Sequence, residues 1–236
     1  MRRLAGGAVV GLLGLLALAP GARADRPGEL AERLRKATAV LDEMASGRQD
    51  TAIPREMLAK ARAVAVFPQV KKGAVIVGGR HGQGVMSVKR AGDARWSAPA
   101  FFTVGGGSVG LQLGGQVIDL VLVVMSDKGV ESLLKSETTL GGDVSVTAGP
   151  KSLHDAANTD GSFKAEIFSY ARSTGFFAGA SFEGATVQPD GGAIRTLYGA
   201  KADSRDVLLG GRYAVPASAQ PFVKVLATYS PPPRKR

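Results

Sequence analysis

The apolar residues near the start of the chain recur at the spacing of an amphipathic helix. They follow one another at intervals of four and three, which places them on one stripe of a helix that begins near residue 29. The residues of this stripe are Leu30, Leu34, Ala37, Leu41 and Met44. The opposite face mixes acidic and basic side chains, whereas a helix lying on a membrane surface usually has a basic face. We therefore expect this helix to pack on the protein's own core, and Pro54 to begin a second short helix.

Beyond residues 64–68 the pattern changes to short runs of valine, isoleucine and phenylalanine, punctuated by glycine. Two strands, 74–78 and 84–89, are expected to form a hairpin around Gly79, Arg80, His81 and Gly82, because glycine permits the positive φ of tight turns. Further strands are expected at 100–104, 109–114, 117–125, 143–148, 164–172 and 176–182. Helices are expected at 128–135, with Ser126 or Asp127 as N-cap, and at 217–228.

This order of elements predicts the fold class. Consecutive strands with short glycine turns and little helix between them favour an antiparallel sheet. We expect an α+β fold: a mainly antiparallel β sheet, closed or folded over like a barrel, with the N-terminal amphipathic helix and further short helices packed on it.

The first 24 residues have the pattern of a cleavable signal peptide. The basic pair Arg2 and Arg3 precedes a short leucine-rich stretch, and the small residues Ala22 and Ala24 occupy the two positions that signal peptidase reads. Cleavage after Ala24 would release a periplasmic or secreted protein. We expect one domain over residues 25–229, followed by a proline-rich basic tail at 230–236.

The amino-acid composition limits the kinds of site and partner that the protein can have. The sequence contains no cysteine, which excludes disulfides, zinc–thiolate sites, thiol nucleophiles and a lipid-modified cysteine anchor. Lysine and arginine number 30 against 20 acidic residues, and the net charge of +10 favours anionic partners. Part of this excess lies in the tail, at Arg234, Lys235 and Arg236.

The bases around the predicted hairpin are the candidates for contact with anionic lipid head groups. They are Lys71, Lys72, Arg80, Lys89, Arg90 and Arg95. Each basic side chain near an anionic surface contributes about 1 kcal/mol, so four acting together would form a reversible peripheral contact. A solvated hairpin face without a ligand is the open alternative.

The glycine-rich segment 105–110 fits one nucleotide-binding pattern and one hydrolase pattern. It matches G-x-G-x-x-G, and it also matches G-x-S-x-G with Ser108 as nucleophile and His154 downstream. Both sites need a helix directly after the glycines, whereas residues 111–114 alternate like a strand. A serine hydrolase using Ser108 is therefore the least favoured function. The two histidines, His81 and His154, offer no local spacing for a metal, so we expect no metal and no cofactor.

Asp119 interrupts the apolar run 117–125. A carboxylate that faces an interior is costly unless it is hydrogen-bonded or paired with a cation. We expect Asp119 to be partly buried with such a partner, while a titratable group in an apolar setting also remains a candidate site.

Several stretches in order along the chain resemble the SYLF domain. They are Ala65-Val66-Phe67-Pro68, Gly78-Gly79 with Gly82 and Gly84, Trp96 to Phe101, Gly105 to Gly110, Gly141-Gly142-Asp143, Ala148-Gly149-Pro150, Ser169 to Ser173, Gly175 to Gly179, Glu183-Gly184 and Leu197-Tyr198-Gly199. The resemblance implies a module that binds lipid or membrane without catalytic activity, and it makes the triple glycine a structural turn. Eukaryotic members are actin- and phosphoinositide-associated.

Together these observations predict an exported, non-enzymatic protein that makes a reversible contact with anionic lipid or a membrane surface. No nucleic acid partner is expected. The alternative is a protein-interaction module of the cell envelope that uses the same surface for another protein.

Overall fold

Four long strands form the centre of a curled sheet. A computed structural model describes residues 26–47, 52–74, 78–90, 95–108, 116–150, 165–173, 176–179 and 182–230. The long strands are β1 (Ala63–Ala74), β2 (Gly78–Val88), β3 (Ala100–Ser108) and β4 (Gln116–Val124). They are flanked by β5 (Thr138–Thr139), β6 (Val146–Ala148), β7 (Ile167–Ser173), β8 (Phe176–Gly179) and β9 (Thr186–Pro189).

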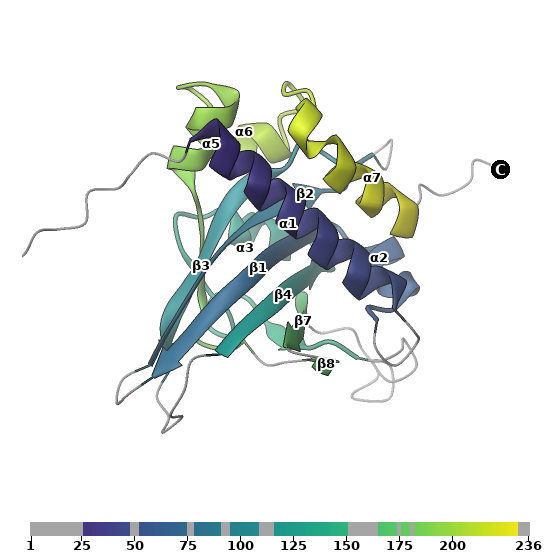
Figure 1. Ribbon diagram of the computed structural model, residues 1–236, viewed down its shortest axis with the longest axis vertical. Helices are drawn as coiled ribbons and strands as arrows, with labels where there is room; N and C mark the ends of the chain where they lie inside the picture. The colour runs from purple at the N-terminus through teal and green to yellow at the C-terminus, as the bar shows by residue number, and fades with distance from the viewer. Residues whose placement is uncertain are drawn as a thin grey trace, which may run out of the picture.

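The strand order is β5-β9-β3-β2-β1-β4-β7-β6, and β8 pairs with β7. Within the described residues all pairings are antiparallel except that of β6 with β7. The sheet curls into a half-barrel (Figure 1). The expected α+β fold with a mainly antiparallel, folded-over sheet is confirmed.

Helices pack on this sheet. They are α1 (Pro27–Ser46), α2 (Arg55–Lys60), α3 (Asp127–Leu133), α5 (Gly191–Tyr198), α6 (Ser204–Leu208) and α7 (Gln220–Tyr229). Helix α1 lies across β1 and β2, with α7 beside it (Figure 1). All five residues of its predicted apolar stripe are at most 1% exposed. Among the described residues, no helix is long and apolar enough to cross a membrane.

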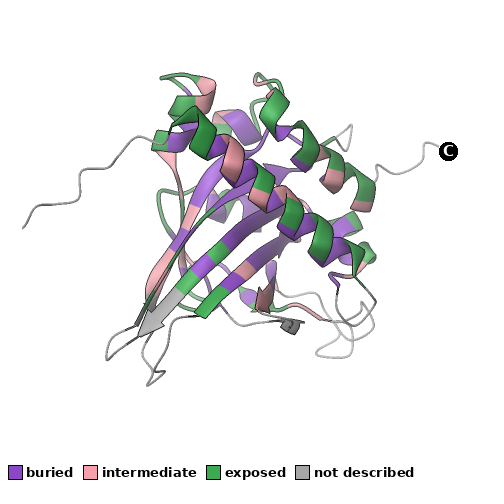
Figure 2. Cartoon of the chain, viewed as in Figure 1, coloured by how far each residue is buried: buried purple, intermediate pink, exposed green. Residues whose placement is uncertain are grey.

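The central strands are buried on both faces, because one face contacts the helices and the other lines the inside of the curl. Residues 63–68 of β1 and 120–124 of β4 are all buried (Figure 2). Toward the end of these strands that points away from the helices, exposed residues appear, including Lys71 and Gln116. The apolar core therefore lies under α1 and α7, and the far ends of β1 to β4 reach solvent.

The predicted position of the hairpin turn was wrong. Gly79 to Gly82 do not form its turn but lie inside β2, which pairs with β1 from Ala63↔Val88 to Ala74↔Gly78. The glycines serve packing instead. A side chain at Gly84 would stand 2.3 Å from the carbonyl oxygen of Val66 and 2.5 Å from the ring of Phe67. Gly82 and Gly84 of β2 therefore lack side chains where Val70 and Phe67 of β1 need the space.

The triple glycine at 105–107 is likewise not a turn, because it belongs to β3 and pairs with Gly79 to His81 of β2. Only Gly106 has a positive φ, of 133°, and a side chain there would lie 2.9 Å from the carbonyl oxygen of Gly184. The expected strand at 109–114 lies outside the described residues.

Most of β1 and the short strands β5 and β9 were not predicted, whereas the expected strands at 100–104, 117–125, 143–148, 164–172 and 176–182 and the expected helices agree with the structure to within a few residues. Helix α3 is capped as predicted, since the Ser126 hydroxyl accepts a hydrogen bond from Gly129 N at 2.9 Å. The short helices α5 and α6 were not predicted. Each begins at an aspartate that caps the helix, Asp190 and Asp203, by accepting from a backbone N–H of the first turn.

Candidate functional site

Asp119 is partly buried and paired, as predicted. Its side chain is 19% exposed, and its Oδ2 accepts a hydrogen bond from Arg172 Nη2 at 2.8 Å. Its Oδ1 accepts from the backbone N–H of Gln69 at 3.0 Å. Gln69 lies in a bulge of β1 with a φ of 53°. This left-handed backbone conformation is unfavourable for most residues other than glycine. Asp119 thus holds the bulge in place, which gives the carboxylate a structural role.

The six predicted lipid contacts do not form one patch. Lys71, Lys72 and Arg80 lie at the solvent end of β1 and β2, where Lys72 pairs with Arg80 and Lys71 pairs with His81. We call Lys71, Lys72, Arg80 and His81 the basic end. Lys89, Arg90 and Arg95 lie beyond the other end of β2. Nine or ten residues of strand separate the two groups, which is about 30 Å.

Arg80 is the unusual member of the basic end. It is half-buried, and its guanidinium lies over the ring of Phe182, 5.5 Å from the ring centre. Its Nε is buried without a hydrogen-bond acceptor, and no carboxylate of the described residues forms an ion pair with it. Burial lowers the pKa of Arg80, because the charged form loses hydration that no neighbour replaces. Within the described residues, the end of the sheet therefore carries a cation that contacts an aromatic ring and has one unsatisfied donor.

Exposed groups lie at the same strand end as this cation but on the opposite face of the sheet, because successive strand residues alternate faces. Lys71 and His81 are exposed and are direct partners across β1 and β2. Val117, the partner of Lys71 on β4, is 52% exposed, although a valine is ordinarily buried. The basic end thus combines positive charge with some exposed apolar surface.

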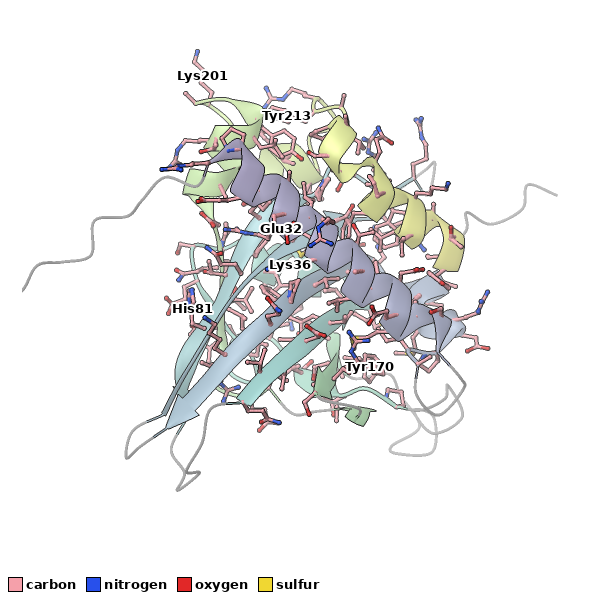
Figure 3. The ribbon with its side chains drawn as sticks, in the orientation of Figure 1. Glu32, Lys36, His81, Tyr170, Lys201 and Tyr213 are labelled. Atoms are coloured by element: carbon pink, nitrogen blue, oxygen red, sulfur yellow. The ribbon has the colours of Figure 1, made fainter. Side chains whose placement is uncertain are left out.

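An open polar groove of about 340 Å³ continues from the basic end along α1. We call it the α1 groove. Lys71 and His81 line it from the sheet, and Glu32 and Lys36 line it from α1. Figure 3 shows Glu32 and Lys36 on the helix and His81 toward the edge of the sheet. Lys36 Nζ is 3.8 Å from Glu32 Oε1 and donates to Gln69 Oε1 at 3.3 Å, so the charges along the helix are largely balanced.

The side chain of Lys89 points into the protein and is not exposed for contact with a lipid head group. It is 8% exposed, its Nζ donates to Ala59 O at 2.7 Å and to the hydroxyl of Ser230, and it lies 5.3 Å from the ring centre of Trp96. Burial, followed by the charge of Arg62, lowers its pKa. Lys89 anchors the end of α7 to the sheet.

Arg90 and Arg95 differ from each other. Arg95 is exposed, whereas Arg90 is half-buried and has a buried Nε without an acceptor, as Arg80 does. Of the arginines in the described part of the chain, only Arg80 and Arg90 have such a nitrogen. Both were among the sequence candidates, so the structure singles out two of the six.

Neither catalytic pattern has the required geometry. The elbow expected of a nucleophile at Ser108 needs a sharp turn after a strand, but Gly105 to Ser108 continue β3 as extended strand. The second half of the motif and His154 lie outside the described residues. In the described part of the motif, Gly105 to Gly107 lie in a strand and not in the loop that a nucleotide-binding site requires there.

Sequence reasoning missed a buried ion pair that ties α1 to α5. Arg33 is 7% exposed, and its Nη1 donates to Asp190 Oδ2 at 2.9 Å. Its guanidinium also lies 5.2 Å from the ring centre of Phe101 on β3. The two charged residues are 157 positions apart, so no local pattern connects them.

Comparison with known proteins gives consistent matches. Residues 105–229 match the family model Ysc84, described as "Las17-binding protein actin regulator". Protein YSC84 of Saccharomyces cerevisiae is 35% identical over 207 residues, which cover 85% of this chain and 44% of that protein. SH3 domain-containing YSC84-like protein 1 of Homo sapiens is 31% identical over 209 residues, which cover 86% of this chain and 60% of that protein. The chain thus spans about half the length of the curated relatives it matches.

Proposed function

Because the chain belongs to the Ysc84 family, whose module is the SYLF domain, we propose that it is a non-enzymatic protein that binds an anionic lipid or membrane surface reversibly. The basic end makes the contact. The observation that carries this proposal is the half-buried guanidinium of Arg80, whose Nε has no acceptor. An arginine whose buried Nε lacks an acceptor among the described residues fits a ligand that supplies one, and lipid phosphate oxygens form strong charge-assisted hydrogen bonds with guanidinium groups.

The surroundings of Arg80 suit a flat, negatively charged surface. Exposed Lys71 adds a flexible cation, and exposed Val117 beside it offers apolar area to the interfacial region of a bilayer. Strands β1 and β2 extend past α1 toward the basic end, so the end of the sheet can approach a membrane (Figure 1).

The expected strength follows from the number of bases. Three residues at about 1 kcal/mol each contribute about 3 kcal/mol, or roughly a hundredfold in affinity. Charges of this kind act within a Debye length of about 8 Å at physiological salt, so binding should weaken steeply as salt rises.

Reversing the charge of the basic end is therefore expected to abolish binding to anionic vesicles. In the variant Lys71→Glu, Lys72→Glu, Arg80→Glu, flotation with phosphatidylglycerol vesicles should fall about a hundredfold or more in apparent affinity, while circular dichroism and thermal unfolding report an intact fold. Deletion of residues 231–236 should only weaken binding. If the triple variant floats as well as the unchanged protein, the membrane contact lies elsewhere.

The chain offers a control with the same change in net charge. Arg195, Lys201 and Lys224 are exposed, and no ion pair involves them in the described structure. The variant Arg195→Glu, Lys201→Glu, Lys224→Glu should therefore keep most of its binding, because these residues lie on α5, beyond it and on α7, away from the basic end. Equal losses in both variants would mean that net charge and not a defined surface drives the contact.

A protein partner at the same surface is the second candidate. The family description and the names of relatives such as LAS seventeen-binding protein 3 refer to protein binding. Dependence on lipid composition separates the two functions, because only a lipid-binding protein distinguishes phosphatidylglycerol from phosphatidylcholine vesicles in the absence of other proteins.

We also propose that the protein is exported and acts in the periplasm or outside the cell. The signal-peptide pattern of residues 1–24 supports this location, although these residues lie outside the described structure. We expect the mature protein to begin at Asp25. N-terminal sequencing of protein recovered from the periplasm or medium checks this, and a start more than a few residues away, or retention of the full chain in the cytosol, would contradict it.

A further inference from the structure

A second groove lies at the opposite end of β2 from the basic end. It has a volume of about 330 Å³ and lies between the end of β2, helix α3 and the end of helix α6. We call it the α3–α6 groove. Its apolar lining consists of Val88, Val130, Leu208 and Leu209. Leu209 is 42% exposed, and with Val117 it is one of two large exposed apolar residues in the described structure.

Most charged groups of this groove already have partners within the protein. Arg62 donates to Asp127 Oδ1 at 2.7 Å, and Glu131 is paired with Arg205. Lys89 donates to Ala59 O and to Ser230. Lys89 and Arg90 are therefore both outside any ion pair formed by the described residues, but the ammonium group of Lys89 has neutral acceptors, which leaves Arg90 as the lining cation with an unsatisfied donor.

Arg90 presents the same deficit as Arg80. Its backbone N–H is satisfied by Arg95 O at 2.8 Å, but its side-chain Nε is buried without an acceptor. A buried donor that gives up water and receives no replacement is costly, and an anionic ligand in the groove can repay that cost. A cation with one unsatisfied donor beside an aliphatic wall defines the complementary ligand: an anionic group on an aliphatic chain.

We propose that the α3–α6 groove binds a carboxylate carried on a short aliphatic chain. The carboxylate accepts hydrogen bonds from the guanidinium of Arg90, and the chain packs on Val130, Leu208 and Leu209. Two sources present this chemistry, a free fatty acid and the C-terminus of a peptide that ends in an aliphatic residue. The site is separate from the basic end, so it adds a second ligand to the proposed membrane contact.

Titration of ¹⁵N-labelled full-length protein with sodium octanoate tests the proposal. Octanoate should shift the amide signals of Val130, Leu208 and Leu209 in a saturable way. Loss of one charge-assisted interaction is worth about a tenfold fall in affinity, so Arg90→Met should weaken octanoate binding by at least this factor. The matched variant Arg95→Met removes a neighbouring exposed arginine and should leave the affinity unchanged.

Two further arms keep the test decisive. Leu209→Asp changes an exposed side chain and should also weaken octanoate without loss of fold, because it places a second negative charge beside the ligand. Tighter binding of N-acetyl-glycyl-leucine than of octanoate, lost in its C-terminal amide, would assign the groove to peptide C-termini, and the reverse order would assign it to fatty acids. Absence of groove shifts with both probes, or equal affinity in Arg90→Met, would overturn the proposal.

Discussion

Replacement of Asp190 by alanine is expected to lower the free energy of unfolding by about 3–5 kcal/mol. Asp190 has two roles. Its Oδ2 pairs with the buried Arg33 of α1, and its Oδ1 accepts the first-turn N–H of Ala193 as the N-cap of α5. Removal of the carboxylate strips a buried cation of its counter-ion and uncaps a helix at the same time. Urea unfolding followed by circular dichroism measures the loss.

Asp203 provides the matched control. It caps α6 in the same way, by accepting from Asp206 N at 2.7 Å, but it forms no ion pair with a buried arginine in the described structure. Asp203→Ala should therefore cost only about 1 kcal/mol. Combining Asp190→Ala with Arg33→Met should restore part of the loss, because the buried charge that has lost this carboxylate is removed and an apolar side chain takes its place. Equal costs for the two aspartates would show that the ion pair adds nothing to the cap.

Gly84→Val is expected to destabilise the fold by at least about 3 kcal/mol. The new Cβ would lie 2.3 Å from the backbone oxygen of Val66, and backbone in a paired central strand cannot move without breaking the ladder. The side chain would also collide with the ring of Phe67, which is fully buried. Thermal unfolding should show a large fall in Tm, or the protein should fail to fold.

Gly79→Val distinguishes packing from the general effect of changing a glycine in β2. Gly79 lies in the same strand, but a Cβ at this position would have no other atom within 4 Å, so the substitution should be close to neutral. Joining Gly84→Val to Phe67→Ala should recover part of the stability, since the ring no longer occupies the space. A neutral Gly84→Val would refute the close packing of β1 on β2.

The sequence predicts those helices and strands whose buried faces give the apolar residues a regular spacing along the chain. The stripe from Leu30 to Met44 reports one buried face of α1, and the apolar run ending at Val124 reports a strand buried on both faces. Ser126 at the start of α3 was predictable because a capping side chain acts on its own neighbours. Asp190 and Asp203 carry the same local signal and could have revealed α5 and α6.

The first half of β2 could not be recognised in this way, because the reason for its glycines lies in another strand. Glycine ordinarily indicates a turn, but Gly82 and Gly84 are bare because Val70 and Phe67 of β1 fill the space beside them. The need for glycine in β2 arises from packing between two strands. A single sequence shows the glycines of one segment and the large side chains of the other, but not that they are in contact.

The candidate site was predicted in composition but not in arrangement. The six bases are near one another in the sequence, yet an extended strand moves the chain about 3.3 Å per residue and carries Arg80 and Arg90 to opposite ends of the sheet. Lys89 belongs to neither surface, because its ammonium group is held by Ala59 and Ser230. Arg33, which lies on the predicted helix, gave no sign of its distant partner.

The packing of α1 against α7 also determines when the domain can close during synthesis. Helix α1 is the first described element of the chain and α7 is the last, and they lie side by side over the sheet (Figure 1). The apolar face of α1 therefore lacks part of its cover until residues 220–229 have left the ribosome. Because such long-range contacts form late, the domain stays incompletely folded until residues 220–229 are free to pack on α1.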